Sequence, residues 1–155
     1  MLMDRTILLC LLMLFMTYGC NGSGNEDPPK PDQEVHNTNR LLQYFITENP
    51  GKEVIKYALK DLNNDGREDL LIIYKVGKEK NMMCVILDLG EKYVATNELP
   101  APVSNQVILF KDIDDKPPME FIVHGSKGAK VGYAIFRVEK GQIVDLFGEG
   151  MADCC

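Results

Sequence analysis

The chain has 155 residues, of which 45% are hydrophobic and 26% are charged, and its formal net charge is −6. This length and composition indicate one globular domain with enough apolar residues for a modest core. An acidic chain without a basic stripe offers little attraction to a phosphate backbone, so we expect no nucleic-acid partner.

Residues 1–19 have the pattern of an export signal. Arg5 lies near the amino terminus, and Ile7 to Met16 is an apolar run of ten residues, which is too short to cross a bilayer as a helix. Residues 17–20, Thr-Tyr-Gly-Cys, resemble a bacterial lipobox, although the Thr and Tyr depart from the residues that a lipobox prefers. The resemblance implies a lipoprotein that is extracytoplasmic and anchored to a bacterial membrane by fatty-acyl chains, such as palmitate, on Cys20. Simple secretion with cleavage nearby is the alternative.

Two segments connect this leader to the rest of the chain. Residues 20–32 are polar and rich in Gly and Pro, which predicts a flexible tether. Residues 33–48 predict one amphipathic helix, which Asn49-Pro50-Gly51 would end. The apolar positions near helical spacing in this segment are Val35, Leu42, Phe45 and Ile46.

From residue 53 onward the chain consists of short β-rich runs that repeat. At an offset of 51 residues, Lys60–Asn64 aligns with Lys111–Asp115 without a gap, and Asp69–Ile72 aligns with Glu120–Val123. This predicts a mainly β domain, residues 33–151, with two tandem propeller-blade-like units of about four strands each after the helix. The units are residues 53–100 and 104–151. The predicted strands are 54–60, 69–76, 82–88 and 92–96 in the first unit, and 106–111, 119–124, 131–139 and 142–147 in the second.

The first unit contains a loop with the pattern D-x-N-x-D-G-x-x-D. Oxygen-bearing side chains at alternate positions, a Gly at the sharp turn and a closing carboxylate suit a hard cation such as Ca²⁺. Because Ile72 stands where an EF-hand has its bidentate Glu, the loop is not a complete EF-hand. We expect at most one calcium ion with a structural role, and the alternative is an Asx-rich hairpin without metal. The candidate calcium-binding residues are Asp61, Asn63, Asp65, Arg67 and Asp69.

In the second unit, Lys116 replaces the candidate ligand Asp65. We expect its ammonium group to lie among the acidic side chains of this second loop, where it would supply the charge that the first loop takes from solution. Those acidic side chains are Asp112, Asp114 and Glu120.

The Asp loop and the apolar strand that follows it, Leu70 to Tyr74, resemble the FG-GAP and VCBS class of β-repeats. Members of that class carry such loops between strands. The resemblance extends over both units.

Cys84 lies in the apolar run Met82-Met83-Cys84-Val85-Ile86-Leu87. We expect it to be a small buried hydrophobe rather than a metal ligand. A soft-metal cluster with Met82 and Met83 is the alternative, but alternate side chains of a strand face opposite sides, which favours core packing.

Cys154 and Cys155 form a dithiol tail, residues 152–155. Adjacent thiolates can bind one soft ion such as Hg²⁺, Cu⁺ or As(III), and a disulfide between them would close a strained, easily reduced ring. We expect the glycines before the pair to keep the segment that leads to the two cysteines flexible. Asp153 and the terminal carboxylate are expected to raise the thiol pKa values, which disfavours an activated nucleophile and favours metal capture or exchange. A pair without any role is the alternative.

The lipobox-like leader, the small acidic domain and the terminal Cys154-Cys155 together resemble the Cys-Cys-COOH (seleno)protein family, the SaoC-like lipoproteins, in which selenocysteine can occupy the tail. The resemblance implies an accessory protein of a selenium-linked system with membrane transport components. It also implies redox or soft-element chemistry at the tail. Both positions are cysteine in this chain, so selenium itself is not required.

The sequence therefore predicts a membrane-anchored accessory protein whose tail dithiol binds or relays a soft metal, a metalloid or reducing equivalents to a membrane transporter or thiol-redox partner. One alternative is a thiol oxidoreductase shuttle, and another is a calcium-stabilised adhesion or carbohydrate-binding module. We expect no organic cofactor and favour a non-enzymatic role, because the sequence has no Ser-His-Asp or His-Glu-x-x-His pattern. His36 and His124 have no partner at a ligand spacing, so we expect both to be structural.

Overall fold

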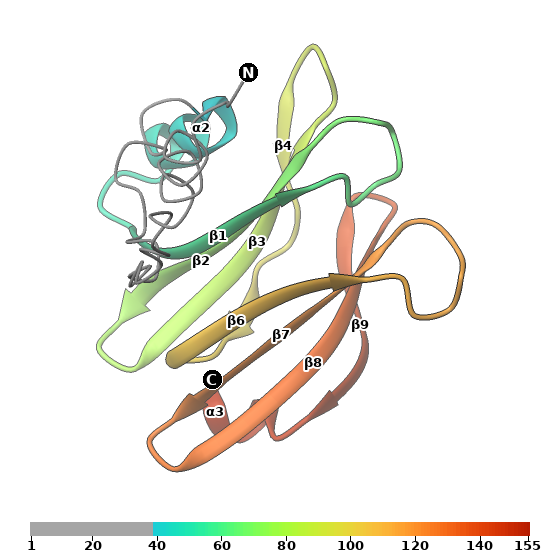
Figure 1. Cartoon of the computed structure of the whole chain (residues 1–155). Coiled ribbons are helices and arrows are strands. Elements are labelled where there is room, and N and C mark those ends of the chain that lie inside the picture. Colours follow the sequence, from blue (N-terminus) through green and yellow to red (C-terminus); the bar gives the residue numbers. More distant parts are fainter. Residues whose placement is uncertain (1–38) are drawn as a thin grey trace, which may run out of the picture. The chain divides into compact units, whose positions relative to one another are not determined.

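The computed structural model describes residues 39–155 and shows a mainly β fold (Figure 1). Two antiparallel sheets follow one another along the chain, with one helix before them and one short helix after them. The prediction of two tandem units of about four strands, preceded by a helix, is confirmed. The predictions for the signal peptide and Cys20, for the tether and for the start of the helix, residues 33–38, lie outside the described residues. Within residues 39–155, no helix has the length and hydropathy needed to cross a membrane.

The first sheet corresponds to the first predicted unit. Its strands are β1 (Glu53–Lys60), β2 (Asp69–Gly77), β3 (Lys80–Asp88), β4 (Tyr93–Ala95) and β5 (Leu99–Ala101). Both β4 and β5 pair with β3, so they form one interrupted edge strand. At the interruption, the Thr96 hydroxyl takes the place of a backbone carbonyl and accepts the N–H of Val85 at 3.0 Å. The sequence predicted only the first half of this edge strand.

The second sheet corresponds to the second predicted unit and has the strand order β6-β7-β8-β9. Its strands are β6 (Ser104–Lys111), β7 (Glu120–Lys127), β8 (Lys130–Glu139) and β9 (Gln142–Glu149), and the short helix α3 (Met151–Cys154) follows them. All eight predicted strands are present, with ends that differ by a few residues. The β5 strand and the α3 helix were not predicted.

The central strands of the first sheet, β2 and β3, are buried on both faces. Along β2, alternate side chains face opposite sides. Leu71 and Ile73 pack against the second sheet, whereas Leu70 and Ile72 pack under the helix α2 (Arg40–Glu48). A strand covered on both faces is apolar throughout, which explains the continuous apolar run in its sequence.

The α2 helix begins where the Asn39 side chain accepts hydrogen bonds from the backbone N–H groups of Leu41 and Leu42, at 3.0 and 3.1 Å. Such a cap satisfies donors that the first helical turn leaves unpaired. Leu42 and Phe45 are buried as predicted, but Ile46 is 39% exposed, so its place on the packed face was wrongly predicted. The packed face consists of Leu41, Leu42 and Phe45, and Ile46 lies one step of the helix beyond it.

Both sheets bury the same face, although a different element covers it in each unit. Leu70 and Phe121 are equivalent at the 51-residue offset, yet Leu70 lies under α2 and Phe121 lies against the first sheet. Equivalent faces of the two sheets are therefore covered by different elements. The α2 helix covers this face of the first sheet, and the first sheet covers the same face of the second sheet. In the described part of the chain, the opposite face of the second sheet leaves large apolar side chains exposed, namely Leu109, Val131, Tyr133 and Phe147.

Candidate metal-binding sites

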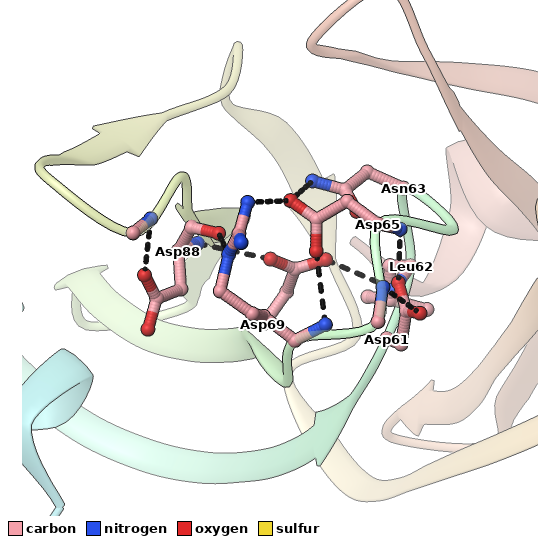
Figure 2. Close-up of polar contacts among 9 residues, drawn as sticks. Asp61, Leu62, Asn63, Asp65, Asp69 and Asp88 are labelled. Atoms are coloured by element: carbon pink, nitrogen blue, oxygen red, sulfur yellow. Dashed lines mark hydrogen bonds and ion pairs between the residues drawn. The ribbon is translucent and has the colours of Figure 1, made fainter.

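The first candidate site is the loop between β1 and β2, which Figure 2 shows. The Asp61 carboxylate accepts hydrogen bonds from the backbone N–H groups of Asp65 at 3.2 Å and Gly66 at 2.8 Å. The side-chain oxygen of Asn63 also accepts the Asp65 N–H, at 3.0 Å. Gly66 has a φ of 84°, a left-handed value that glycine adopts without strain. The pattern of alternating Asp and Asn therefore forms a tight turn held by Asx hydrogen bonds.

Arg67, one of the candidate residues, brings a positive charge into this loop. Its guanidinium forms an ion pair with Asp65 at 2.8 Å, and its backbone N–H donates to the same carboxylate at 2.9 Å. Burial alone would raise the pKa of Asp65, but the hydrogen bonds from Arg67 and Asn63 and the guanidinium charge outweigh it and lower the pKa. An incoming cation would compete with this guanidinium for Asp65.

Asp69, the closing carboxylate of the pattern, is turned into the domain and is 0% exposed. One of its oxygens accepts the backbone N–H of Leu62 at 2.9 Å, and the other accepts that of Asp88 at 3.0 Å (Figure 2). Burial raises the pKa of Asp69, and the two N–H bonds only partly offset this rise. Asp61, Asn63 and Asp65 are therefore the more accessible oxygen donors of the loop.

The second loop, between β6 and β7, repeats the buried contact of Asp69. Glu120 is 1% exposed and accepts the backbone N–H of Ile113 at 3.0 Å, which is the equivalent bond at the 51-residue offset. Sequence reasoning aligned the two acids, and it expected Asp69 to bind calcium and Glu120 to lie beside Lys116. It did not recognise that each acid holds its loop to the next strand. The signal was present, because each acid directly precedes an apolar strand.

Carboxylates converge in the second loop rather than in the first. Oxygens of Asp112, Asp114 and Glu120 lie within 4.8 Å of one another. Arg137 of β8 reaches this cluster and pairs with Asp114 at 2.7 Å and also with Glu120. The prediction that the Lys116 ammonium supplies the internal charge is wrong, because the pairing cation is Arg137. The reason is the register of β7 and β8, which brings Arg137 opposite Glu120 across the sheet.

Cys84 is a buried hydrophobe, as predicted. It is 3% exposed and packs with the side chains under α2, whereas Met83 packs on the other face, between the sheets. The two residues therefore cannot form one soft-metal cluster. Burial raises the pKa of the Cys84 thiol to about 12, which leaves it unreactive at neutral pH.

His124 lies in β7 and is half-buried.

The dithiol tail packs on the domain, whereas the sequence predicted a freely exposed pair. The α3 helix packs against β7 and β8, and Cys154 is 0% exposed. The approach is close because Gly132 has no side chain, and a Cβ there would lie 2.5 Å from backbone atoms of Gly150 and 2.9 Å from Cys154 Sγ. The Cys154 carbonyl also accepts the N–H of Val103, in the segment between the two units, at 3.1 Å. The tail is thus docked onto the domain.

Three sulfur atoms meet where α3 docks. Cys154 Sγ lies 3.4 Å from Cys155 Sγ and 3.8 Å from Met151 Sδ, and Cys155 Sγ lies 4.0 Å from Met151 Sδ. Cys155 is half-buried and lines a cavity of about 290 Å³ between the edge strand of the first sheet and the second sheet. The other lining residues are Leu99, Pro100, Phe136, Asp145, Met151 and Ala152. Sequence reasoning missed Met151, although the spacing Met-x-x-Cys-Cys would have indicated it.

The pKa of the Cys155 thiol is raised, in the direction predicted. Its main cause is burial, followed by the hydrogen bond and the charge of Cys154, while the positive charge of Lys127 lowers the pKa slightly. Asp153, the expected cause, instead pairs with Lys130 at 2.9 Å. Cys155 is therefore a neutral thiol at neutral pH.

The chain matches no known family model, no curated protein and no solved structure.

Proposed function

We propose that this chain is an extracytoplasmic lipoprotein whose Cys154–Cys155 pair binds a soft metal or metalloid ion and passes it to a membrane partner. One observation carries the proposal. The two sulfur atoms lie 3.4 Å apart, which is close enough for both to bind one ion, and Cys155 also lines a cavity. Because two protein ligands do not close a coordination shell, such an ion would remain exchangeable.

The raised thiol pKa of Cys155 favours this role over thiol–disulfide exchange. Exchange needs a thiolate that attacks another sulfur, and a neutral, half-buried thiol supplies few thiolates. A soft cation, in contrast, displaces the thiol protons itself and compensates the buried negative charge. Relay of reducing equivalents is the second candidate role of the pair.

The membrane location rests on the sequence of residues 1–20 and on the resemblance to SaoC-like lipoproteins. A lipid on Cys20 would confine the domain to a membrane surface, where a transporter or a thiol-redox protein could accept the ion. The docked tail fits transfer after contact with that partner, because a helix of four residues has little stability of its own and could be displaced.

We also propose that the first loop binds one structural calcium ion. Asp61, Asn63 and Asp65 offer hard oxygen donors on one tight turn, and a carboxylate that accepts one hydrogen bond per oxygen still has free lone pairs. The bound ion would replace the Arg67 guanidinium as the positive charge that neutralises the Asp65 carboxylate. This role concerns stability and is independent of the dithiol.

The decisive test of the dithiol is binding of Hg²⁺ or trivalent arsenic to the full chain, followed by alkylation and mass spectrometry. We expect one equivalent to bind and to protect Cys155, the accessible thiol of the pair, from alkylation. The variant with Cys154→Ser and Cys155→Ser should lose this binding, and Cys155→Ser alone separates the loss from any change in packing around Cys154. Equal binding by the double variant would refute the proposal. Loss of both thiol hydrogens without bound ion would instead favour the redox role.

A further inference from the structure

The thioether of Met151 completes a triangle of sulfur atoms with the two thiols. The sides of this triangle are 3.4, 3.8 and 4.0 Å. All three atoms come from α3 and the residue after it, in which Met151, Cys154 and Cys155 have the spacing i, i+3 and i+4. Residues at this spacing lie on one face of a helix, so the triangle follows from local geometry.

The size of the triangle suits one metal ion. The circle through three points with these separations has a radius of about 2.2 Å, and metal–sulfur bonds in proteins are about 2.3 Å long. An ion near the centre of the triangle would thus reach all three sulfur atoms with little movement. The arrangement already has the dimensions of a trigonal site.

The ligand set selects the kind of ion. Thiolate together with thioether sulfur is a soft donor set that favours monovalent copper. A structural zinc ion would need four ligands in a tetrahedron, and harder cations prefer oxygen. The walls of the adjacent cavity are mostly apolar, with Asp145 as their one acidic side chain.

We propose that Met151, Cys154 and Cys155 together form a trigonal site for monovalent copper. The inference rests on the proposed function of the dithiol and names both its third ligand and its cargo. Binding releases one proton from each thiol to solvent and leaves the thioether neutral, so the complex carries a net charge of one minus. No electron is transferred, because copper enters and leaves as Cu⁺.

The experiment titrates the full chain with Cu⁺ under argon against a chromogenic Cu⁺ chelator, and it uses X-ray absorption to count sulfur neighbours. Met151→Leu nearly preserves side-chain volume, so it removes the thioether with little change in packing. Met119→Leu is the matched control, because Met119 is half-buried and lies far along the chain from α3. We expect three sulfur neighbours in the parent and in Met119→Leu, but two in Met151→Leu, with copper bound about tenfold or more weakly.

The outcomes separate this inference from the proposed function. If Met151→Leu binds copper as tightly as the parent and with the same number of sulfur neighbours, Met151 is not a ligand, while the dithiol proposal stands. If the parent binds Hg²⁺ but not Cu⁺, the copper site is refuted and the dithiol again stands. If Cys154→Ser with Cys155→Ser still binds both ions, both proposals fail together.

Discussion

The backbone N–H of Leu62 donates a 2.9 Å hydrogen bond to the buried carboxylate of Asp69, seven residues further along the chain. The same bond joins Ile113 to Glu120 at 3.0 Å, which makes it a common element of the two units. In both places an acid at the start of a strand closes the loop that precedes it. The first loop is thus held by a buried hydrogen bond whether or not an ion is bound.

Asp69→Ala should therefore destabilise the domain. The change leaves the N–H groups of Leu62 and Asp88 without a partner, and a buried unsatisfied group costs about 1–3 kcal/mol. Asp65→Ala, at an exposed position of the same loop, should change the free energy of unfolding by less than about 1 kcal/mol in the absence of calcium. Urea denaturation of both variants in EDTA measures the difference, and equal effects would contradict the structural role of Asp69.

Calcium should raise the melting temperature of the metal-free protein. At a concentration about 100 times Kd, linkage adds about 2.7 kcal/mol to the free energy of unfolding. Asp65→Ala should abolish the response, Lys116→Ala should retain it, and Arg67→Ala should lower Kd because the competing guanidinium is gone. Thermal denaturation with Ca²⁺ or EDTA is the measurement. An unchanged melting temperature would show that the loop is an Asx-rich hairpin without metal.

Arg137→Ala should be among the most destabilising single changes in the second sheet. It removes the cation that pairs with Glu120, whose side chain is 1% exposed, and an unpaired buried charge costs about 3–5 kcal/mol. Glu120→Gln should recover part of this loss when it is added to Arg137→Ala. Lys116→Ala, which removes the originally expected cation, should have an effect below about 0.5 kcal/mol. The prediction fails if Lys116→Ala proves the more harmful change in chemical denaturation.

Gly132→Ala should displace α3 from the second sheet. The added Cβ would meet backbone atoms of Gly150 at 2.5 Å, and overpacking of this kind costs about 1–3 kcal/mol. Cys154 should then react with iodoacetamide faster than in the parent, as followed by mass spectrometry. Gly77→Ala is the control, because its nearest neighbour would be the Cβ of Lys80 at 3.7 Å. An unchanged Cys154 reactivity would mean that the tail docks without the space at Gly132.

Alkylation of Cys155 should depend steeply on pH. Burial raises its thiol pKa above the ordinary value, so at pH 7–9 the native protein holds mostly the neutral thiol, and the rate should rise roughly tenfold per pH unit. At the same pH, Cys155 should react faster in the unfolded chain, because it regains the ordinary pKa of a thiol. Stopped alkylation at several pH values, with and without urea, measures both rates. A native rate that is independent of pH in this range would indicate a thiolate and contradict the raised pKa.

The sequence by itself determined the features that depend on local pattern. The apolar runs predicted the strands, and the 51-residue offset predicted the two units. Single-strand periodicity also placed Cys84 correctly, because adjacent side chains of a strand face opposite sides. These features depend on residues that are close together in the sequence, so they can be predicted without knowledge of the tertiary packing.

The tertiary structure alone decided which residues meet across the sheets. Arg137 replaces Lys116 as the partner of Glu120 because the pairing of β7 and β8 brings it there. The burial of Cys154 depends on the absence of a side chain at Gly132, which lies in β8. No pattern in the sequence of the tail indicates this contact. A four-residue helix is too short to form without such packing, so its face with three sulfur atoms exists only in the folded domain.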